Sequence, residues 1–293
     1  MGSYLNPGNF SFKGSLRSKI YVDKSKLIAK TNEVLCTEQK YICVSRPRRF
    51  GKSMAANMLA AYYARSENTE ELFQNLVISK DVSYKENLNQ YDVIKINMQE
   101  FLSMSGTMEE MLEMLKKYLV LDFEETYPQV RFRDEKNLIQ VMKDVFSYTR
   151  CPFVILIDEW DCLFREYKQD REAQKKYLDF LRAWLKDKDY VALAYMTGIL
   201  PIKKYGSHSA LNMFTEYSMT DPGDLAGYFG FTEQEVSRLC DTYDMNFEEA
   251  KTWYDGYHLI AHRQNGDEHY SIYSPKSVVE AMLRHKFGTY WNQ

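Results

Sequence analysis

One stretch near the N-terminus constrains the fold more than any other, because it joins a short apolar run to a helix through a basic loop. The run is residues 41–44 (YICV), the loop is residues 45–53 (SRPRRFGKS), and residues 54–63 are rich in good helix formers. A buried strand, a loop ending in Gly-Lys-Ser and a helix make the pattern of a phosphate-binding P-loop. The sequence therefore predicts an anion site at the start of this helix.

The residues of the loop have distinct expected roles. Gly51 lets the backbone approach a phosphate, Lys52 brings a positive charge to the β- and γ-phosphates, and the Ser53 hydroxyl is a ligand for Mg²⁺. Backbone N–H groups of residues 49–53 complete the cradle. The expected nucleotide-binding residues are Arg46, Pro47, Arg48, Arg49, Phe50, Gly51, Lys52, Ser53 and Met54.

The loop departs from the consensus G-x-x-x-x-G-K-[ST] at its first position, where Arg46 replaces glycine. We expect Arg46 to adopt backbone angles that are open to a residue with a side chain. Its side chain is expected to pack away from the phosphates or along them. Taken alone, the stretch has an alternative interpretation as a surface turn with a basic cluster.

A second stretch supports nucleotide binding. Residues 153–157 (FVILI) are apolar without alternation, as in a central parallel strand covered on both faces, and they run into Asp158 and Glu159. This is a Walker B pattern. We expect Asp158 to hold Mg²⁺ and Glu159 to position and deprotonate the attacking water. The alternative is a strand that ends in the N-cap of a helix.

With both motifs present, the sequence resembles the bacterial AAA-ATPase-like proteins. The resemblance rests on residues 21–25 (YVDKS), the loop with arginine at its first position, and residues 157–161 (IDEWD). It extends to residues 230–236 (GFTEQEV), 253–257 (WYDGY) and 273–278 (YSPKSV). The resemblance implies ATP and Mg²⁺ as ligands. Members commonly carry a C-terminal nuclease-like domain of the PD-(D/E)XK type, which is not expected within residues 1–293. Whether the protein meets a nucleic-acid partner through such a domain, and whether it forms a homo-oligomer, are left open by the sequence.

The remaining apolar stretches indicate an α/β fold. Strands are expected at residues 91–98, 190–198 and 213–220, and helices at residues 107–120, 135–148 and 172–186. As in the additional-strand class of P-loop ATPases, strand 190–198 is expected between the P-loop strand and the Walker B strand of a parallel five-stranded sheet. Thr197 would then lie near the γ-phosphate as a catalytic sensor beside Glu159 and Lys52. A strand-ending threonine before a glycine turn is the alternative.

Three segments are expected along the chain. Residues 1–40 pack near the nucleotide, with Tyr21 either against the adenine or in ordinary packing, and residues 41–221 form the ATPase core. Residues 222–293 begin at a Pro-Gly break and form a helical, winged-helix-like lid. The lid is expected to hold helices at residues 231–241, 245–255 and 275–287, the first with a capping box, and a hairpin around residues 265–266.

Composition narrows the class of protein. With 45% hydrophobic and 27% charged residues, the chain has the composition of an ordinary folded protein, and its net charge of −3 gives no overall attraction to nucleic acid or anionic membranes. No apolar stretch is long enough to span a bilayer, and the five cysteines lack a C-x-x-C pair, as expected in a reducing cytoplasm. We expect a cytoplasmic Mg²⁺-dependent ATPase; the alternative is a nucleotide-dependent switch or scaffold that does not hydrolyse.

Overall fold

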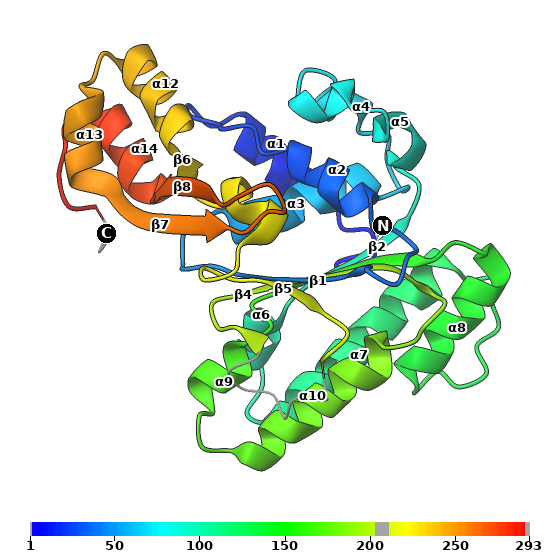
Figure 1. Cartoon of the computed structure of the whole chain (residues 1–293). Helices are drawn as coiled ribbons and strands as arrows, with labels where there is room; N and C mark the ends of the chain where they lie inside the picture. Colours follow the sequence, from blue (N-terminus) through cyan, green and yellow to red (C-terminus); the bar gives the residue numbers. More distant parts are fainter. Residues whose placement is uncertain (1, 203–210, 291–293) are drawn as a thin grey trace.

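A parallel sheet of five strands forms the centre of the molecule (Figure 1). The structure is a computed structural model that describes residues 2–202 and 211–290. The strand order is β2-β3-β4-β1-β5. The prediction that strand 190–198 lies between the P-loop strand and the Walker B strand is therefore confirmed. The strands are β1 (Tyr41–Ser45), β2 (Asp92–Asn97), β3 (Phe153–Asp158), β4 (Val191–Gly198) and β5 (Thr215–Tyr217).

The register of the sheet brings the polar ends of the strands to one edge. Val44 pairs with Thr197, and Asn97 pairs with Asp158. Every residue of β1, β3 and β4 is buried, which explains their nearly continuous apolar sequences. Because parallel strands end at the same edge, residues that are distant in sequence meet there.

Helices cover both faces of the sheet (Figure 1). Alternate residues of each strand point to opposite faces, so that Ile155 and Ile157 join one apolar cluster while Val154 and Leu156 join the other. One layer holds α1 (Phe10–Leu16), α2 (Lys26–Asn32), α3 (Lys52–Tyr63), α4 (Glu70–Phe73), the 3₁₀ helix η1 (Val77–Lys80) and α5 (Tyr84–Asn87). The other holds α6 (Met98–Ser103), α7 (Met108–Thr126), α8 (Leu138–Thr149), α9 (Cys162–Glu166) and α10 (Arg171–Leu185).

The C-terminal part adds a smaller antiparallel sheet with the order β6-β8-β7. The predicted capping box is present, because Thr232 and Glu235 accept hydrogen bonds from each other's backbone N–H groups. The predicted hairpin and the three predicted helices of this C-terminal part are also present. The elements are the 3₁₀ helix η2 (Gly223–Tyr228), β6 (Phe231–Thr232), α12 (Glu233–Tyr243), α13 (Phe247–Tyr254), β7 (Asp255–Ala261), β8 (Glu268–Tyr273) and α14 (Pro275–Arg284).

A partly buried lysine links the N-terminal segment to this C-terminal part. Lys24 Nζ donates to both carboxylate oxygens of Glu235, at 2.8 and 2.6 Å, and to the carbonyl of Gly227 at 2.7 Å. Burial lowers the pKa of Lys24, while Glu235 acts in the opposite direction. Both charges are mostly shielded from water, so each needs the other as a partner. The contact fixes the start of α12 beside the segment that carries Tyr21.

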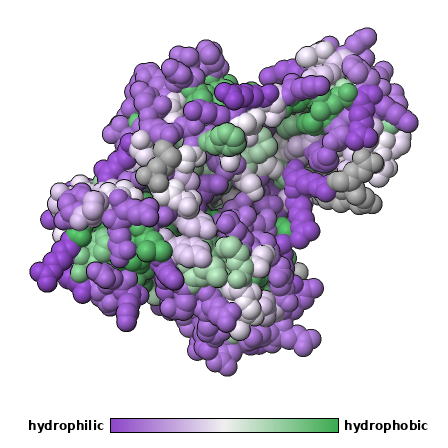
Figure 2. All heavy atoms as spheres, turned by 180° about the vertical axis from the view of Figure 1, so that it is seen from behind, coloured by the Kyte–Doolittle hydropathy of each residue, from purple (hydrophilic) through white to green (hydrophobic). Residues whose placement is uncertain are grey.

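The surface is mainly polar. Figure 2 shows a face that is mostly hydrophilic, with its hydrophobic residues in separate patches. Within residues 2–202 and 211–290, no helix combines the length and the apolar character that crossing a membrane requires. The same residues contain no group of three or more His, Cys, Asp or Glu side chains arranged to hold a metal ion.

Candidate functional site

The P-loop connects the end of β1 to the start of α3 through two residues with left-handed backbone angles. Arg49 has a φ of 67° and Gly51 a φ of 86°. Glycine adopts such angles without steric cost, which explains Gly51. The positive φ of Arg49 is unfavourable and uncommon for a residue that has a Cβ. The loop therefore turns twice immediately before Lys52 and directs the first N–H groups of α3 toward the carboxyl edge of the sheet.

Lys52 is folded back onto its own loop. Its Nζ donates to the carbonyl oxygens of Arg46 at 3.0 Å and Pro47 at 2.9 Å. Its burial lowers the pKa of Lys52, while the nearby Glu159 and Asp158 carboxylates oppose that shift. A phosphate oxygen is a stronger partner for an ammonium than a carbonyl, so the Lys52 side chain is placed to exchange one for the other.

Three oxygen-bearing side chains meet at the ends of β3, β4 and α3. The Ser53 hydroxyl donates to Asp158 Oδ2, and the Thr197 hydroxyl donates to Asp158 Oδ1. Asp158 Oδ1 also accepts from the backbone N–H of Glu159 at 3.0 Å. A carboxylate and a hydroxyl are the hard oxygen ligands that Mg²⁺ prefers, so Ser53 and Asp158 fit this ion.

Thr197 is fully buried and is directed at Asp158. Gly198 follows it because a Cβ at that position would lie 2.7 Å from Nε1 of Trp160. The expected direct contact of Thr197 with a γ-phosphate stays a prediction. The observed geometry favours an action of Thr197 through the orientation of Asp158.

Glu159 lies just beyond the end of β3, with an uncommon positive φ of 54°. Its carboxylate accepts a hydrogen bond from Nη2 of Arg165, in an ion pair that is largely shielded from water. Burial raises the pKa of the Glu159 carboxyl, and Arg165 opposes this shift. A carboxylate with a raised pKa is a stronger base, which suits the expected role of Glu159.

A polar cavity of about 600 Å³ lies against Lys52, Ser53 and Glu159, whereas Asp158 and Thr197 lie behind its wall. Its lining includes the predicted residues Arg48, Arg49, Gly51, Lys52, Ser53, Met54 and Glu159. It also includes Asn97, Gln99, Arg165 and Glu166, which the sequence interpretation did not single out. Asn97 ends β2, so the rule that parallel strands end at one edge was a usable signal for it. Arg165 lies in a helix of only five residues, which offers no periodic pattern.

An apolar cavity of about 570 Å³ adjoins the polar one. Both cavities are lined by Arg49, Gly51 and Met54, so they meet at the start of α3. The walls of the apolar cavity come from three parts of the chain: Phe12, Ile20 and Tyr21, then Met54 and Met58, then Tyr228, Phe231 and Val279. Tyr21 lines this cavity, and its expected contact with a base stays a prediction. Its burial raises the pKa of the Tyr21 hydroxyl, which keeps it protonated.

Phe50 has a different environment from the rest of the loop. Its side chain is 1% exposed and packs with Leu259 and Ile272, and its ring lies 5.1 Å from that of Tyr257, edge to face. Its carbonyl accepts the N–H of Gly230 at 3.1 Å. The Phe50 side chain thus joins the P-loop to the C-terminal part.

Arg46 is buried behind the loop, with 1% of its surface exposed. Its Nη1 donates to the carbonyls of Ser45 at 2.9 Å and Tyr217 at 2.8 Å, and its guanidinium lies 5.6 Å from the ring centre of Phe229. Burial lowers the pKa of Arg46 to about 10. Arg46 is absent from the residues with positive φ, as predicted, and its side chain packs away from the polar cavity.

This placement predicts that the Arg46 side chain is dispensable for binding. In Arg46→Met, the loss of hydrogen bonds to two carbonyls and the removal of a buried charge should offset each other, leaving the free energy of unfolding within about 2 kcal/mol of wild type. ATP affinity measured by calorimetry should change by less than about threefold, since no phosphate contact is lost. A folded Arg46→Met protein that no longer binds ATP would show that the guanidinium is a ligand.

Comparison with known proteins identifies the family. The profile of the family described as "Predicted AAA-ATPase" matches residues 11–207. The chain belongs to this predicted AAA-ATPase family. One relative of this chain is described as an uncharacterized protein in the vnfD 5' region of Azotobacter chroococcum mcd 1. It is 22% identical over 282 residues, which are 92% of this chain and 50% of the relative.

Solved structures similar to this predicted AAA-ATPase include the Aeropyrum pernix ORC1 protein in complex with DNA and C. elegans PCH-2. The first has a TM-score of 0.44 and 12% identity, covering 85% of this chain and 55% of the other. The second has a TM-score of 0.36 and 14% identity, covering 85% and 53%. The chain thus spans about half the length of the proteins that it matches.

Proposed function

We propose that this predicted AAA-ATPase binds Mg²⁺-ATP across the two adjacent cavities and hydrolyses it. The observation that carries the proposal is that the two cavities lie next to each other, with Gly51 and Met54 in the lining of both. An apolar chamber suits a base, and a cationic chamber with oxygen ligands suits a triphosphate. The base and sugar would occupy the chamber lined by Tyr21, with the phosphates passing over the N-terminus of α3.

The proposed reaction assigns a task to each polar group. Lys52 leaves the carbonyls of Arg46 and Pro47 and binds β- and γ-phosphate oxygens. Ser53 and Asp158 would hold Mg²⁺, which would neutralise charge on the phosphates when bound. Glu159 accepts a proton from water as its oxygen attacks the γ-phosphorus. The bond between that phosphorus and the bridging oxygen breaks, and ADP and phosphate are the products.

The proposal predicts saturable binding of one Mg²⁺-ATP per chain and Mg²⁺-dependent release of phosphate. Calorimetry measures the first and a phosphate-release assay the second, each with and without EDTA. Removal of Mg²⁺ should abolish turnover, because the charge that the ion neutralises returns to the phosphates. Absence of heat at millimolar ATP, with a correctly folded protein, would contradict the proposal.

A nucleotide-dependent switch is the second candidate. It is favoured by the ion pair between Glu159 and Arg165, which occupies the expected base, and by the insertion of Phe50 into the C-terminal part. The two functions differ in turnover. Tight ATP binding without phosphate release, tested with and without double-stranded DNA and over a range of salt concentrations, would favour the switch.

A further inference from the structure

Arg165 is held at the polar cavity by groups from three elements. Its Nη2 donates to Glu159 at the end of β3, and the same nitrogen lies 3.4 Å from Oε1 of Gln99 in α6. Its Nε lies 3.4 Å from Oδ2 of Asp161, the N-cap residue of α9. The side chain is 16% exposed. These contacts hold the guanidinium beside the cavity.

Asp161 fixes the far side of this arrangement. It is fully buried, and its Oδ2 accepts the backbone N–H groups of Ile199 at 3.0 Å and Leu200 at 2.8 Å. These residues follow directly after β4. The anchor of Arg165 is thus tied to the edge of the sheet by two backbone hydrogen bonds, whereas its partner Glu159 is 21% exposed and reaches Arg165 through its own side chain.

The cavity presents Arg165 and Lys52 as cations that face one volume. A terminal phosphate brings more negative charge than one carboxylate, and its oxygens match the planar fork of a guanidinium. A γ-phosphate that enters this volume therefore competes with Glu159 for the same N–H groups. A diphosphate ends before the γ-position and leaves the ion pair intact.

We propose that Arg165 is the residue that makes this site discriminate a nucleoside triphosphate from a diphosphate, by exchanging the Glu159 carboxylate for the γ-phosphate. The exchange also frees Glu159, so the base becomes available only when there is a γ-phosphate to hydrolyse. The inference rests on the proposed function, since it places the triphosphate in the polar cavity. It concerns binding, and it holds whether or not the protein turns ATP over.

The test is the ratio of affinities for two nucleotides. Calorimetry on the full chain with Mg²⁺ compares ADP with an ATP analogue that has nitrogen between its β- and γ-phosphorus atoms. Arg165→Met should lower the affinity for the analogue by about 10- to 100-fold, which is the usual size of a lost charge-assisted contact. The affinity for ADP should stay within about threefold of wild type. Arg165→Lys should recover part of the loss, and it also serves as the test if the methionine variant does not fold.

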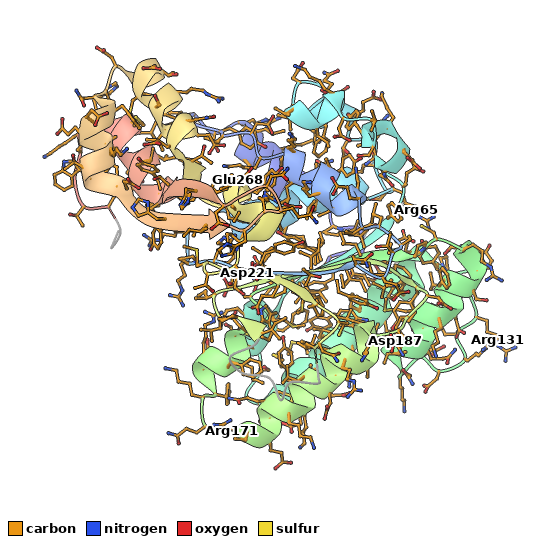
Figure 3. The ribbon with its side chains drawn as sticks, in the orientation of Figure 1. Arg65, Arg131, Arg171, Asp187, Asp221 and Glu268 are labelled. Carbon is orange, nitrogen blue, oxygen red and sulfur yellow. The ribbon has the colours of Figure 1, made fainter. Side chains whose placement is uncertain are left out.

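Two further variants sharpen the test. Glu159→Gln removes the charge that competes for Arg165, so it should raise the affinity for the analogue relative to the affinity for ADP. This increase should disappear in the double variant with Arg165→Met. Arg171→Met is the matched control, because Arg171 is an exposed arginine at the start of α10 in the lower part of Figure 3. It should leave both affinities unchanged.

Two outcomes overturn the inference, and they are distinguishable. A wild-type protein that binds neither nucleotide contradicts the proposed function and the role of Arg165 with it. A wild-type protein that binds both, with the same affinity ratio in Arg165→Met and Arg165→Lys, contradicts the role of Arg165 alone. Equal weakening of both nucleotides would likewise place Arg165 on the α- or β-phosphate or in a structural role.

Discussion

Glu159→Gln should fold, bind Mg²⁺-ATP at least as tightly as wild type, and release phosphate at least about a hundredfold more slowly. The amide keeps the shape of the side chain but does not accept a proton as a carboxylate does. General bases typically contribute about 10²- to 10⁴-fold in rate, which sets the size of the effect. Binding survives because Lys52, Ser53 and Asp158 retain their contacts. Single-turnover phosphate release and calorimetry measure the two quantities separately.

The matched control for this variant is Glu172→Gln. Glu172 is an exposed residue of α10 that pairs with Lys176 on the same helix. Its substitution should leave the rate of phosphate release unchanged, since exposed pairs contribute little. Equal rates in Glu159→Gln and wild type would remove Glu159 from the mechanism and leave the base unassigned.

Lys52→Ala should lose most nucleotide affinity. Charge-assisted hydrogen bonds contribute about 1.5–3 kcal/mol each, which corresponds to about 10- to 150-fold in affinity for a single contact. Lys52 is 5% exposed and already faces the loop carbonyls, so no other cation of the loop is positioned to replace it at the same depth. Calorimetric titration with Mg²⁺-ATP, together with thermal unfolding to verify the fold, gives the result.

Lys175→Ala is the control for the lysine variant, because Lys175 is exposed on α10, in the helix layer that does not contain α3. Its affinity for ATP should equal that of wild type. If Lys52→Ala bound ATP like the control, the assignment of residues 45–53 as a phosphate-binding loop would be wrong. The result would then also remove the basis for placing a triphosphate in the polar cavity.

Local signals were sufficient for the strands of the parallel sheet and the longer helices, but not for short helices such as α9. The apolar runs at residues 41–44 and 153–157 predicted the P-loop strand and the Walker B strand, because a strand buried on both faces needs no polar alternation. The capping box at Thr232 predicted the start of α12, because both of its hydrogen bonds form within four residues. The position of β4 between them followed from the resemblance to additional-strand ATPases.

The destination of individual side chains was decided by packing between distant segments. Phe50 and Arg46 belong to the loop in sequence, yet one is buried beside Leu259 and Ile272 and the other beneath Phe229. No spacing rule connects these residues, since their contacts span more than 180 positions of the chain. The same is true of the apolar cavity, whose walls come from three separate parts of the sequence.

Arg165 illustrates the difference between what local sequence patterns predict and what the packing of distant elements decides. The sequence by itself determined that a phosphate-binding loop and a carboxylate pair would meet at one edge of a parallel sheet, because backbone preferences and periodicity act over a few residues. Only the tertiary structure decided which cation pairs with Glu159, because that depends on how α9 packs beside α6 and the end of β3. Side-chain contacts between elements depend on how the elements are oriented relative to one another. A periodic sequence pattern predicts a single element but not this orientation.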